Sequence, residues 1–141
     1  MIDWEEYDRW MRQARYTLES VNADIEHGSY CWACFKAQQA AEYALKALLR
    51  SLGRPAFGHD LRALSLEVEK VCGGVPRGVW RCALLLDKMY IPTRYPDAFS
   101  SGTSFEHYVR EEAEEAKACA EKIIAWVERC ARRLKEGAGG A

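Results

Sequence analysis

The sequence predicts an all-α fold, an antiparallel up-and-down four-helix bundle with one additional short helix. Apolar residues recur at intervals of three and four along most of the chain. No segment alternates apolar and polar residues between turn signals, as a half-buried strand would. Glycines and prolines divide the periodic stretches into five segments. The 141 residues are predicted to form one domain over residues 1–136, followed by a flexible tail over residues 137–141.

The first predicted helix spans about Asp3 to Glu26 and the second about Ser29 to Leu52. Asp3 and Glu6 form a capping pair at the start of the first helix, and Gly28 ends it. The second helix is apolar on most of its sides, so it is either the central helix of the bundle or part of a subunit interface. Because it exposes too little polar surface for the outside of a small monomer, a homodimer is expected.

Three further helices complete the prediction. A short helix begins after its cap, Asp60, and ends at the break Gly73-Gly74-Val75-Pro76. A fourth helix covers about Arg77 to Tyr90. Thr103 and Glu106 form a capping box, so the last helix is predicted to begin there and to continue to the tail.

Composition and charge exclude several classes of protein. The net charge of −1 at pH 7 gives no global attraction to nucleic acid, so any anion site must be local. No apolar run is long enough to span a bilayer, and the acidic N-terminus lacks the features of a secretory signal. A cytoplasmic protein with no membrane association is therefore expected, and its six cysteines are expected to be buried free thiols. Cys31 and Cys34 form a C-x-x-C within a helical pattern, where packing is favoured over a zinc or redox role.

The segment best suited to chemistry is the loop Thr93-Arg94-Tyr95-Pro96-Asp97, bracketed by Pro92 and Pro96. Two prolines restrict the backbone and lower the entropy lost when the loop becomes ordered. An arginine held in this way presents a planar fork of donors suited to phosphate, and Tyr95 beside it can stack on a base. In the alternative interpretation, Arg94 caps carbonyl groups or pairs with Asp97, and Tyr95 packs on the bundle.

Two further polar groups are candidates for the same site. His59 with Asp60 opens the short helix, either as a cap with a surface histidine or as a polar group facing the same cleft as Arg94. Gln39, Glu42 and Lys46 form a stripe on the second helix that either lines a cleft or is a solvated face. No P-loop, dinucleotide-binding glycine pattern or nucleophile elbow occurs, and no metal or cofactor is expected. The predicted nucleotide- or phosphate-binding residues are Arg94, Tyr95, Asp97, His59 and Lys46.

Part of the second helix resembles the second-helix signature of prokaryotic HEPN proteins, in the run Phe35-Lys36-Ala37-Gln38-Gln39-Ala40-Ala41-Glu42 followed by Leu45-Lys46-Ala47-Leu48. The next segment of the family is similar to His59-Asp60-Leu61 with Leu64, and its later loop to Tyr90 with Arg94-Tyr95-Pro96-Asp97. The alanine-rich last helix also fits the family. The resemblance therefore covers nearly the whole chain.

The resemblance implies an up-and-down bundle that often forms dimers, and a minimal nucleotidyltransferase as its frequent partner in a toxin–antitoxin pair. It thus implies a nucleotide- or RNA-binding helical module. Some family members are metal-independent ribonucleases that carry an arginine, four to six variable residues and a histidine near the start of a late helix. Here the histidine after Arg94 is His107, which is too distant, while Arg54 and His59 have the spacing but lie in the loop after the second helix.

The sequence therefore leaves open whether the protein is an enzyme. The ribonuclease motif of the family is not in its expected place, which favours binding over catalysis. Two alternatives remain beside the binding module. One is a metal-independent endoribonuclease with a non-standard site, and the other is a purely structural dimerisation partner.

Overall fold

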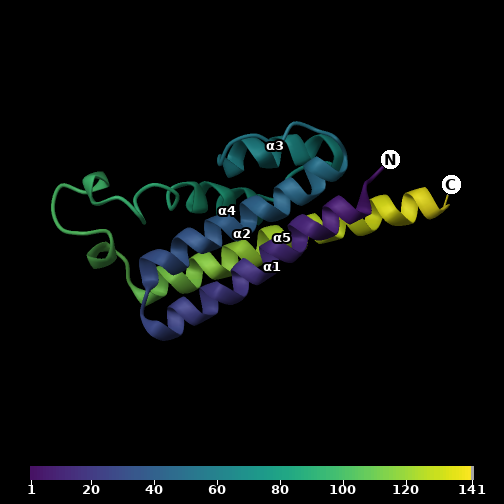
Figure 1. The fold of residues 1–141 in the computed structure, drawn as a ribbon. Helices are drawn as coiled ribbons and strands as arrows, with labels where there is room; N and C mark the ends of the chain where they lie inside the picture. The colour runs from purple at the N-terminus through teal and green to yellow at the C-terminus, as the bar shows by residue number, and fades with distance from the viewer. Residues whose placement is uncertain (141) are drawn as a thin grey trace.

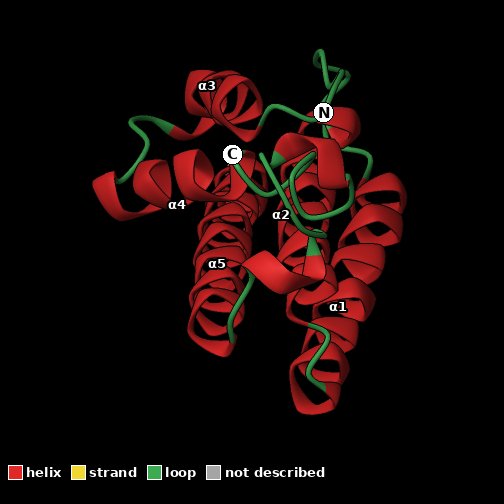
Figure 2. Cartoon of the chain, turned by 90° about the vertical axis from the view of Figure 1, so that its left-hand side faces the viewer, coloured by secondary structure: helices red, strands yellow, loops and turns green. Residues whose placement is uncertain are grey.

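The computed structural model describes residues 1–140 of the chain and the side chains of residues 1–137. These residues form five α-helices, two short 3₁₀ helices and no strand (Figure 2). The bundle consists of α1 (Trp4–His27), α2 (Tyr30–Ser51), α4 (Arg77–Asp87) and α5 (Arg110–Gly140), which alternate in direction (Figure 1). The short helix α3 (Leu61–Cys72) packs on α2 and α4. The all-α bundle predicted from the sequence is confirmed.

The first two helices begin and end close to the predicted positions. The Asp3 carboxylate accepts a hydrogen bond from the Glu6 N–H at 3.1 Å and caps α1. Gly28 adopts a φ of 84°, the left-handed conformation that a glycine C-cap provides. Only Gly28 and Ser29 separate the two helices, so α2 must turn back and pack antiparallel to α1. None of the helices described is long and apolar enough to cross a membrane.

The central position belongs to α2, which packs against α1, α3, α4 and α5. Fifteen of its 22 residues are buried, so its apolar surface is covered within the chain. Of the two predicted places for this helix, the centre of the bundle is therefore the one observed. The apolar surface that suggested a homodimer is thus covered within the described molecule. The homodimer stays a prediction. The predicted alanine positions of this helix are all fully buried: Ala33, Ala37, Ala40, Ala44 and Ala47.

The start of the last helix corrects the sequence prediction. Glu106 does accept hydrogen bonds from the N–H and hydroxyl of Thr103, at 3.0 and 2.8 Å. This capping pair, however, opens only the single-turn 3₁₀ helix η2 (Phe105–His107). Tyr108 is extended, with φ −122° and ψ 136°, and it separates that turn from α5. The predicted start at Thr103 is wrong because a second capping signal follows the first.

That second signal lies at the true start of α5, which is Arg110. Glu112 accepts a hydrogen bond from the Val109 N–H at 3.1 Å, and so satisfies a donor that the helix itself cannot pair. At the other end, α5 is helical to Gly140, and Ala141 lies outside the described residues. The flexibility of the tail over residues 137–141 stays a prediction.

Residues 88–109 form a lobe at one end of the bundle, which Figure 1 shows in green. The fourth helix ends at Asp87 rather than at the predicted Tyr90, and the chain then passes through turns and the 3₁₀ helix η1 (Pro96–Ala98). The buried Thr93 hydroxyl donates to the Met89 carbonyl at 2.7 Å, and this bond holds the first turn of the lobe. Arg94 therefore lies in a loop, as predicted, and only residues 88–90 differ from the predicted helix.

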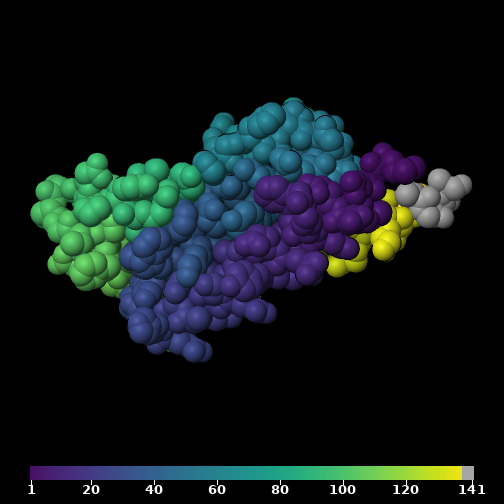
Figure 3. Space-filling view, viewed as in Figure 1, coloured from purple at the N-terminus to yellow at the C-terminus, as the bar shows by residue number. Residues whose placement is uncertain are grey.

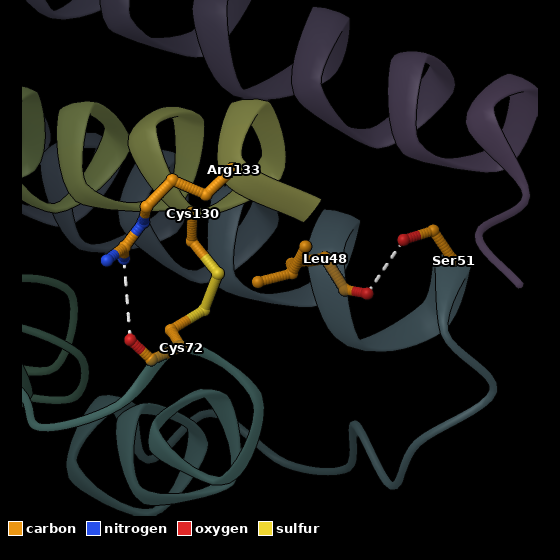
Figure 4. Close-up of a disulfide and its surroundings, with 5 residues drawn as sticks. All are labelled: Leu48, Ser51, Cys72, Cys130 and Arg133. Atoms are coloured by element: carbon orange, nitrogen blue, oxygen red, sulfur yellow. Dashed lines mark hydrogen bonds between the residues drawn. A yellow bond between two sulfur atoms is a disulfide. The ribbon is translucent and has the colours of Figure 1, made fainter. Parts of the chain in front are cut away.

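Four of the six cysteines are paired, which corrects the expectation that all six are free thiols. Disulfides join Cys72 to Cys130 and Cys82 to Cys119, with Cα separations of 5.6 and 5.0 Å. Figure 4 shows the first of these bonds beside Arg133, which donates to the Cys72 carbonyl at 3.4 Å. Both bonds tie α5 to the α3–α4 region. The paired residues lie 58 and 37 positions apart, so only the packing of the helices brings them together.

The remaining two cysteines, Cys31 and Cys34, are buried and free. Burial raises the pKa of the Cys34 thiol to about 12, and it raises the pKa of the Cys31 thiol as well. Both thiols are therefore protonated at neutral pH and are poor metal ligands or nucleophiles. The packing interpretation of this C-x-x-C is confirmed.

Oxidised protein in denaturant should contain two reactive thiols, and reduction should raise the number to six. Closing loops of this length stabilises a fold by about 4 kcal/mol per bond in the chain-entropy account, which is an upper value. Reduction should accordingly lower the Tm, and the double variant Cys72→Ser/Cys130→Ser should reproduce part of that loss. Thiol titration with parallel thermal melts checks this, and six reactive thiols in protein treated with a mild oxidant would contradict it.

Candidate functional site

A buried carboxylate lies at the centre of the candidate site. Glu42 of α2 is 3% exposed, and Lys46, one turn later, is 9% exposed. The Lys46 Nζ lies 3.1 Å from the Glu42 Oε2, so each charge compensates the other. At these two positions the polar stripe of α2 is therefore not a solvated face. This part of α2 is covered because the loop before α3, which contains His59, packs over it.

His59 in that loop reaches the same carboxylate. Its Nδ1 lies 3.0 and 3.1 Å from the two Glu42 oxygens, and the Gln38 amide donates to the His59 carbonyl at 3.0 Å. An ionised carboxylate can only accept, so Nδ1 carries the proton and Nε2 stays available. Asp60 acts as the predicted cap, accepting from the Ala63 N–H at 3.0 Å. His59 is thus a polar group of the site as well as a neighbour of the cap.

Aromatic rings connect His59 to the arginine of the lobe. The His59 ring stacks on the Tyr90 ring, with centroids 4.5 Å apart and planes 17° from parallel. The Arg94 Cζ lies 4.5 Å from the centroid of the same Tyr90 ring, 4.2 Å from that of Phe35 and 5.0 Å from that of Tyr95. Cations over aromatic faces are favourable, and Arg94 is held by three such rings.

One donor of the Arg94 guanidinium is already used within the protein. Its Nε donates to the Tyr90 carbonyl at 2.9 Å, so the carbonyl-capping interpretation is correct for that nitrogen. No ion pair joins Arg94 to any carboxylate among the described residues. The alternative pairing with Asp97, which lies exposed in η1, is therefore not formed. The two terminal nitrogens of Arg94 keep their donors for a ligand.

The structure brings four of the five predicted site residues into one chain of contacts. Lys46, His59 and Arg94 are linked through Glu42 and Tyr90, and Tyr95 lies against the arginine. Asp97 makes no polar contact with them in the described molecule. Arg54, which has the ribonuclease spacing to His59, lies instead 3.9 Å from Glu67 of α3.

Sequence reasoning missed Asp87, the last residue of α4. Its carboxylate accepts from the backbone N–H groups of Leu61 and Arg62 at 2.7 and 3.1 Å. These bonds fix the start of α3 against the end of α4, and with it the position of His59 over Tyr90. A carboxylate in the last turn of a helix is unfavourable for the helix dipole, and this is the signal that Asp87 has a partner elsewhere.

Burial raises the pKa of Asp87 to about 6, and the nearby Asp60 carboxylate adds to the effect, while the two amide donors oppose it. The site therefore contains a carboxyl group that gains a proton in mildly acidic solution.

A hollow of about 630 Å³ lies elsewhere, at the turn between α3 and α4. Positive charge predominates in it, because Arg129, Arg132 and Arg133 of α5 line it together with the single carboxylate of Glu136. Among the residues that the structure describes, the only aromatic one in its wall is Trp126, which is 2% exposed and cannot present a ring face to a ligand. Arg94 and the rings of Phe35, Tyr90 and Tyr95 are called the Arg94 cluster. This cluster combines a cation with accessible rings, so it is the stronger candidate for a ligand site.

The model of the HEPN domain family matches residues 7–130 of this chain. The chain belongs to the HEPN domain family. TT1696 from Thermus thermophilus is 46% identical, with 88% of this chain and 97% of that chain covered and a TM-score of 0.83. ST0689, an archaeal HEPN homologue, is 36% identical, with 86% and 94% covered and a TM-score of 0.73. An HEPN domain protein from Thermotoga maritima is 38% identical, with 89% and 98% covered and a TM-score of 0.70. No curated protein matches the chain.

In this HEPN domain, Glu42→Ala should lower the free energy of unfolding by about 3 kcal/mol, because Lys46 would be left buried and unpaired. The double variant Glu42→Ala/Lys46→Met should recover most of the loss. The exposed pair Arg110–Glu114 has the same spacing, so Glu114→Ala is the matched control and should change stability little. Urea unfolding of these proteins and of the single variant Lys46→Met measures the coupling, and additive effects of the two buried substitutions would contradict the account.

Asp87 should make the stability of the HEPN domain depend on pH. Its folded pKa of about 6 lies above the ordinary value of 3.8, so the folded state binds a proton that the unfolded chain releases. Ionisation therefore opposes folding, and this penalty grows as the pH rises from 3.8 to about 6 and is constant above that range. Because solvent screens the partly exposed carboxyl group, we expect the penalty to lower the free energy of unfolding by only about 1 kcal/mol.

The measurement is the free energy of unfolding at pH 5 and pH 7.5 for the wild type and Asp87→Asn. The free energy of unfolding of the wild type minus that of the variant should decrease from pH 5 to pH 7.5, because the variant cannot ionise. A difference that is independent of pH would show that Asp87 titrates normally.

Proposed function

We propose that this HEPN domain is a nucleotide- or RNA-binding module whose site is the Arg94 cluster. The observation that carries the proposal is the Arg94 guanidinium, held by the rings of Phe35, Tyr90 and Tyr95 with its terminal nitrogens unpaired in the described molecule. Held in this way, the guanidinium loses little entropy when it binds a phosphate through two hydrogen bonds. Tyr95 is 48% exposed, so its ring can accept a base.

His59 adds a second polar group to the proposed phosphate site. Its ring centroid and the Arg94 Cζ each lie 4.5 Å from the Tyr90 centroid, so they are at most about 9 Å apart. With Nδ1 engaged by Glu42, the His59 Nε2 can accept a hydrogen bond from a ribose hydroxyl or, when protonated, donate to a phosphate. Lys46 acts indirectly, by compensating the charge of Glu42 in the buried part of the site.

The proposed partner is a minimal nucleotidyltransferase, with the two proteins acting as a toxin–antitoxin-like pair in the cytoplasm. This part of the proposal rests on membership of the HEPN family. Co-expression with a nucleotidyltransferase encoded beside the gene should yield a complex that survives gel filtration. Separate elution of the two proteins would contradict the pairing.

A homodimer is proposed on a different observation from the one the sequence offered. The lobe carries three large apolar side chains that are about half exposed or more: Ile91, Phe105 and Val109. Apolar surface of this kind is normally covered by a partner, most often through a two-fold contact. Sedimentation at tens of micromolar should show a dimer that Phe105→Glu weakens. A monomeric wild type would contradict the proposed homodimer. It would also contradict the alternative that the chain is a purely structural dimerisation partner.

The second candidate function is a metal-independent endoribonuclease with a non-standard site. It is favoured by the His59–Glu42 pair, since a histidine oriented by a carboxylate is the usual form of a general base. His59 Nε2 would take the proton of a ribose 2′-hydroxyl, while Arg94 would stabilise the charge on the phosphate. This role would be supported if the wild type cleaves RNA in the presence of a chelator and the His59→Gln variant does not. Intact RNA with the wild type would exclude it and leave binding as the function.

Arg94→Ala should weaken binding of nucleoside triphosphates or short RNA about ten- to a hundredfold, which corresponds to about 1.5–3 kcal/mol for a lost charged contact. Arg94→Lys should recover part of the loss, because an ammonium cannot reproduce the planar fork. The matched control is Arg62→Ala, which removes another arginine held over an aromatic ring, 5.8 Å from the centroid of Trp80. Isothermal titration with thermal melts separates binding from folding, and unchanged affinity in well-folded Arg94→Ala would refute the site.

A further inference from the structure

The outward side of α2 extends from the Arg94 cluster toward the far end of the bundle. Successive spacings of seven, four and seven residues place one set of side chains on the same face, and this set is called the α2 stripe: Trp32, Gln39, Tyr43 and Arg50. Figure 3 shows α2 at the surface between α1, α3 and the lobe. The stripe is thus flanked by other elements along its length and is open at its two ends, where Trp32 and Arg50 are exposed.

A second cluster of an arginine with aromatic rings lies at the far end of the stripe. The ring centroid of Trp10 on α1 lies 6.0 Å from that of Tyr43, and the Arg50 Cζ lies 4.9 Å from the Trp10 ring centroid. The Trp10 Nε1 donates to the Glu6 carboxylate at 2.9 Å, which fixes the orientation of the indole. A shallow hollow of about 230 Å³ lies against these rings, between Arg9 and Tyr43.

The two clusters share the same chemistry and lie on opposite flanks of α2. His59, Tyr90 and Arg94 stand on the flank of α3 and the lobe, whereas Trp10 stands on the flank of α1. Phe35 marks one cluster and Arg50 the other, and the 15 residues between them correspond to about 22 Å of helix. A stacked strand rising about 3.4 Å per nucleotide covers this distance with roughly six nucleotides, and a more extended strand needs fewer.

We propose that the α2 stripe binds a single-stranded oligonucleotide, with one base at Tyr95 and Arg94 and another at Trp10 and Tyr43. The inference rests on the proposed function and names its ligand class. Rings that stack on unpaired bases, together with cations for the backbone, are the usual equipment of single-strand sites. A duplex does not fit, because its bases are not free to reach the rings and the net charge of −1 supplies no broad positive face.

Charge along the stripe matches a short strand. Arg94, which has no carboxylate partner among the described residues, provides a cation at one end. At the other end Arg9 and Arg50 share the single carboxylate of Glu6, which leaves one positive charge there, while the buried Lys46 is compensated by Glu42. Glu6 lies 2.9 Å from Arg9 and 3.6 Å from Arg50, so it holds these guanidinium groups in place while their other donors face solvent. The structure does not favour RNA over DNA at the far cluster, so both strands belong in the test.

The experiment is fluorescence anisotropy with labelled oligouridine and oligodeoxythymidine, in lengths from one to about ten nucleotides. Wild-type affinity should increase with length up to roughly six nucleotides and then level off. Trp10→Ala should weaken the binding of the longer strands roughly five- to a hundredfold while leaving mononucleotide affinity unchanged. Arg50→Ala should weaken the same strands and reduce the slope of log affinity against log salt by about one.

Two controls keep the outcome decisive. Arg62→Ala removes an arginine that lies over the Trp80 ring instead of over a ring of either cluster, and it should leave every affinity unchanged. Trp10→Phe retains a ring and should recover part of the affinity, which covers the case in which Trp10→Ala fails to fold.

The results separate this inference from the proposed function. If a mononucleotide binds through Arg94 but affinity does not increase with length, the stripe is not a track and the inference is wrong. If no nucleotide or strand binds, both proposals fail. If Trp10→Ala changes the sedimentation of the protein but not its binding of strands, the far cluster is a contact between copies, which also overturns the inference.

Discussion

A negative charge inside an apolar helix constrains how the rest of this structure is arranged. Glu42 lies on the central helix of the bundle, where an uncompensated carboxylate would cost several kcal/mol. Lys46 one turn later compensates this charge, and His59 from a separate loop donates a hydrogen bond to the carboxylate. The second of these contacts has a consequence for the site, because it draws the loop before α3 onto α2. His59 can then stack on Tyr90, and Tyr90 in turn supports the guanidinium of Arg94.

The helices could be predicted from the sequence because their signals are local. Periodic apolar residues, the Asp3 cap and the Gly28 stop act within one or two turns, and they set α1 and α2 to within a residue. The last helix shows the limit of this reasoning. Two capping signals follow one another, at Thr103 and at Val109, and only the extended conformation of Tyr108 decides that the first opens a single turn. The choice between them depends on how the lobe packs.

The contacts that make the site are long-range, and so the sequence did not reveal them. Arg94, Tyr95 and His59 could be selected from their residue types and neighbours, but the roles of Glu42 and Tyr90 follow from the way α2, α3 and the lobe meet. Asp87 acts through backbone groups 25 and 26 residues earlier. The disulfides are hidden in the same way, because helical periodicity says nothing about which thiols face each other. Membership of the HEPN family fixes the fold, whereas the ligand must be argued from these side chains.

The central claim is that the arginine held over Tyr90, beside the histidine that Glu42 orients, forms the place where a nucleotide binds. The most direct measurement is an NMR titration with a mononucleotide that follows the Arg94 Nε–H, the His59 ring nitrogens and the side chains of Arg129, Arg132 and Arg133. The account predicts that the Arg94 and His59 signals shift together along one binding curve. Saturable shifts confined to the three arginines of α5, with Arg94 and His59 unmoved, would contradict it and place the anion site at the other hollow.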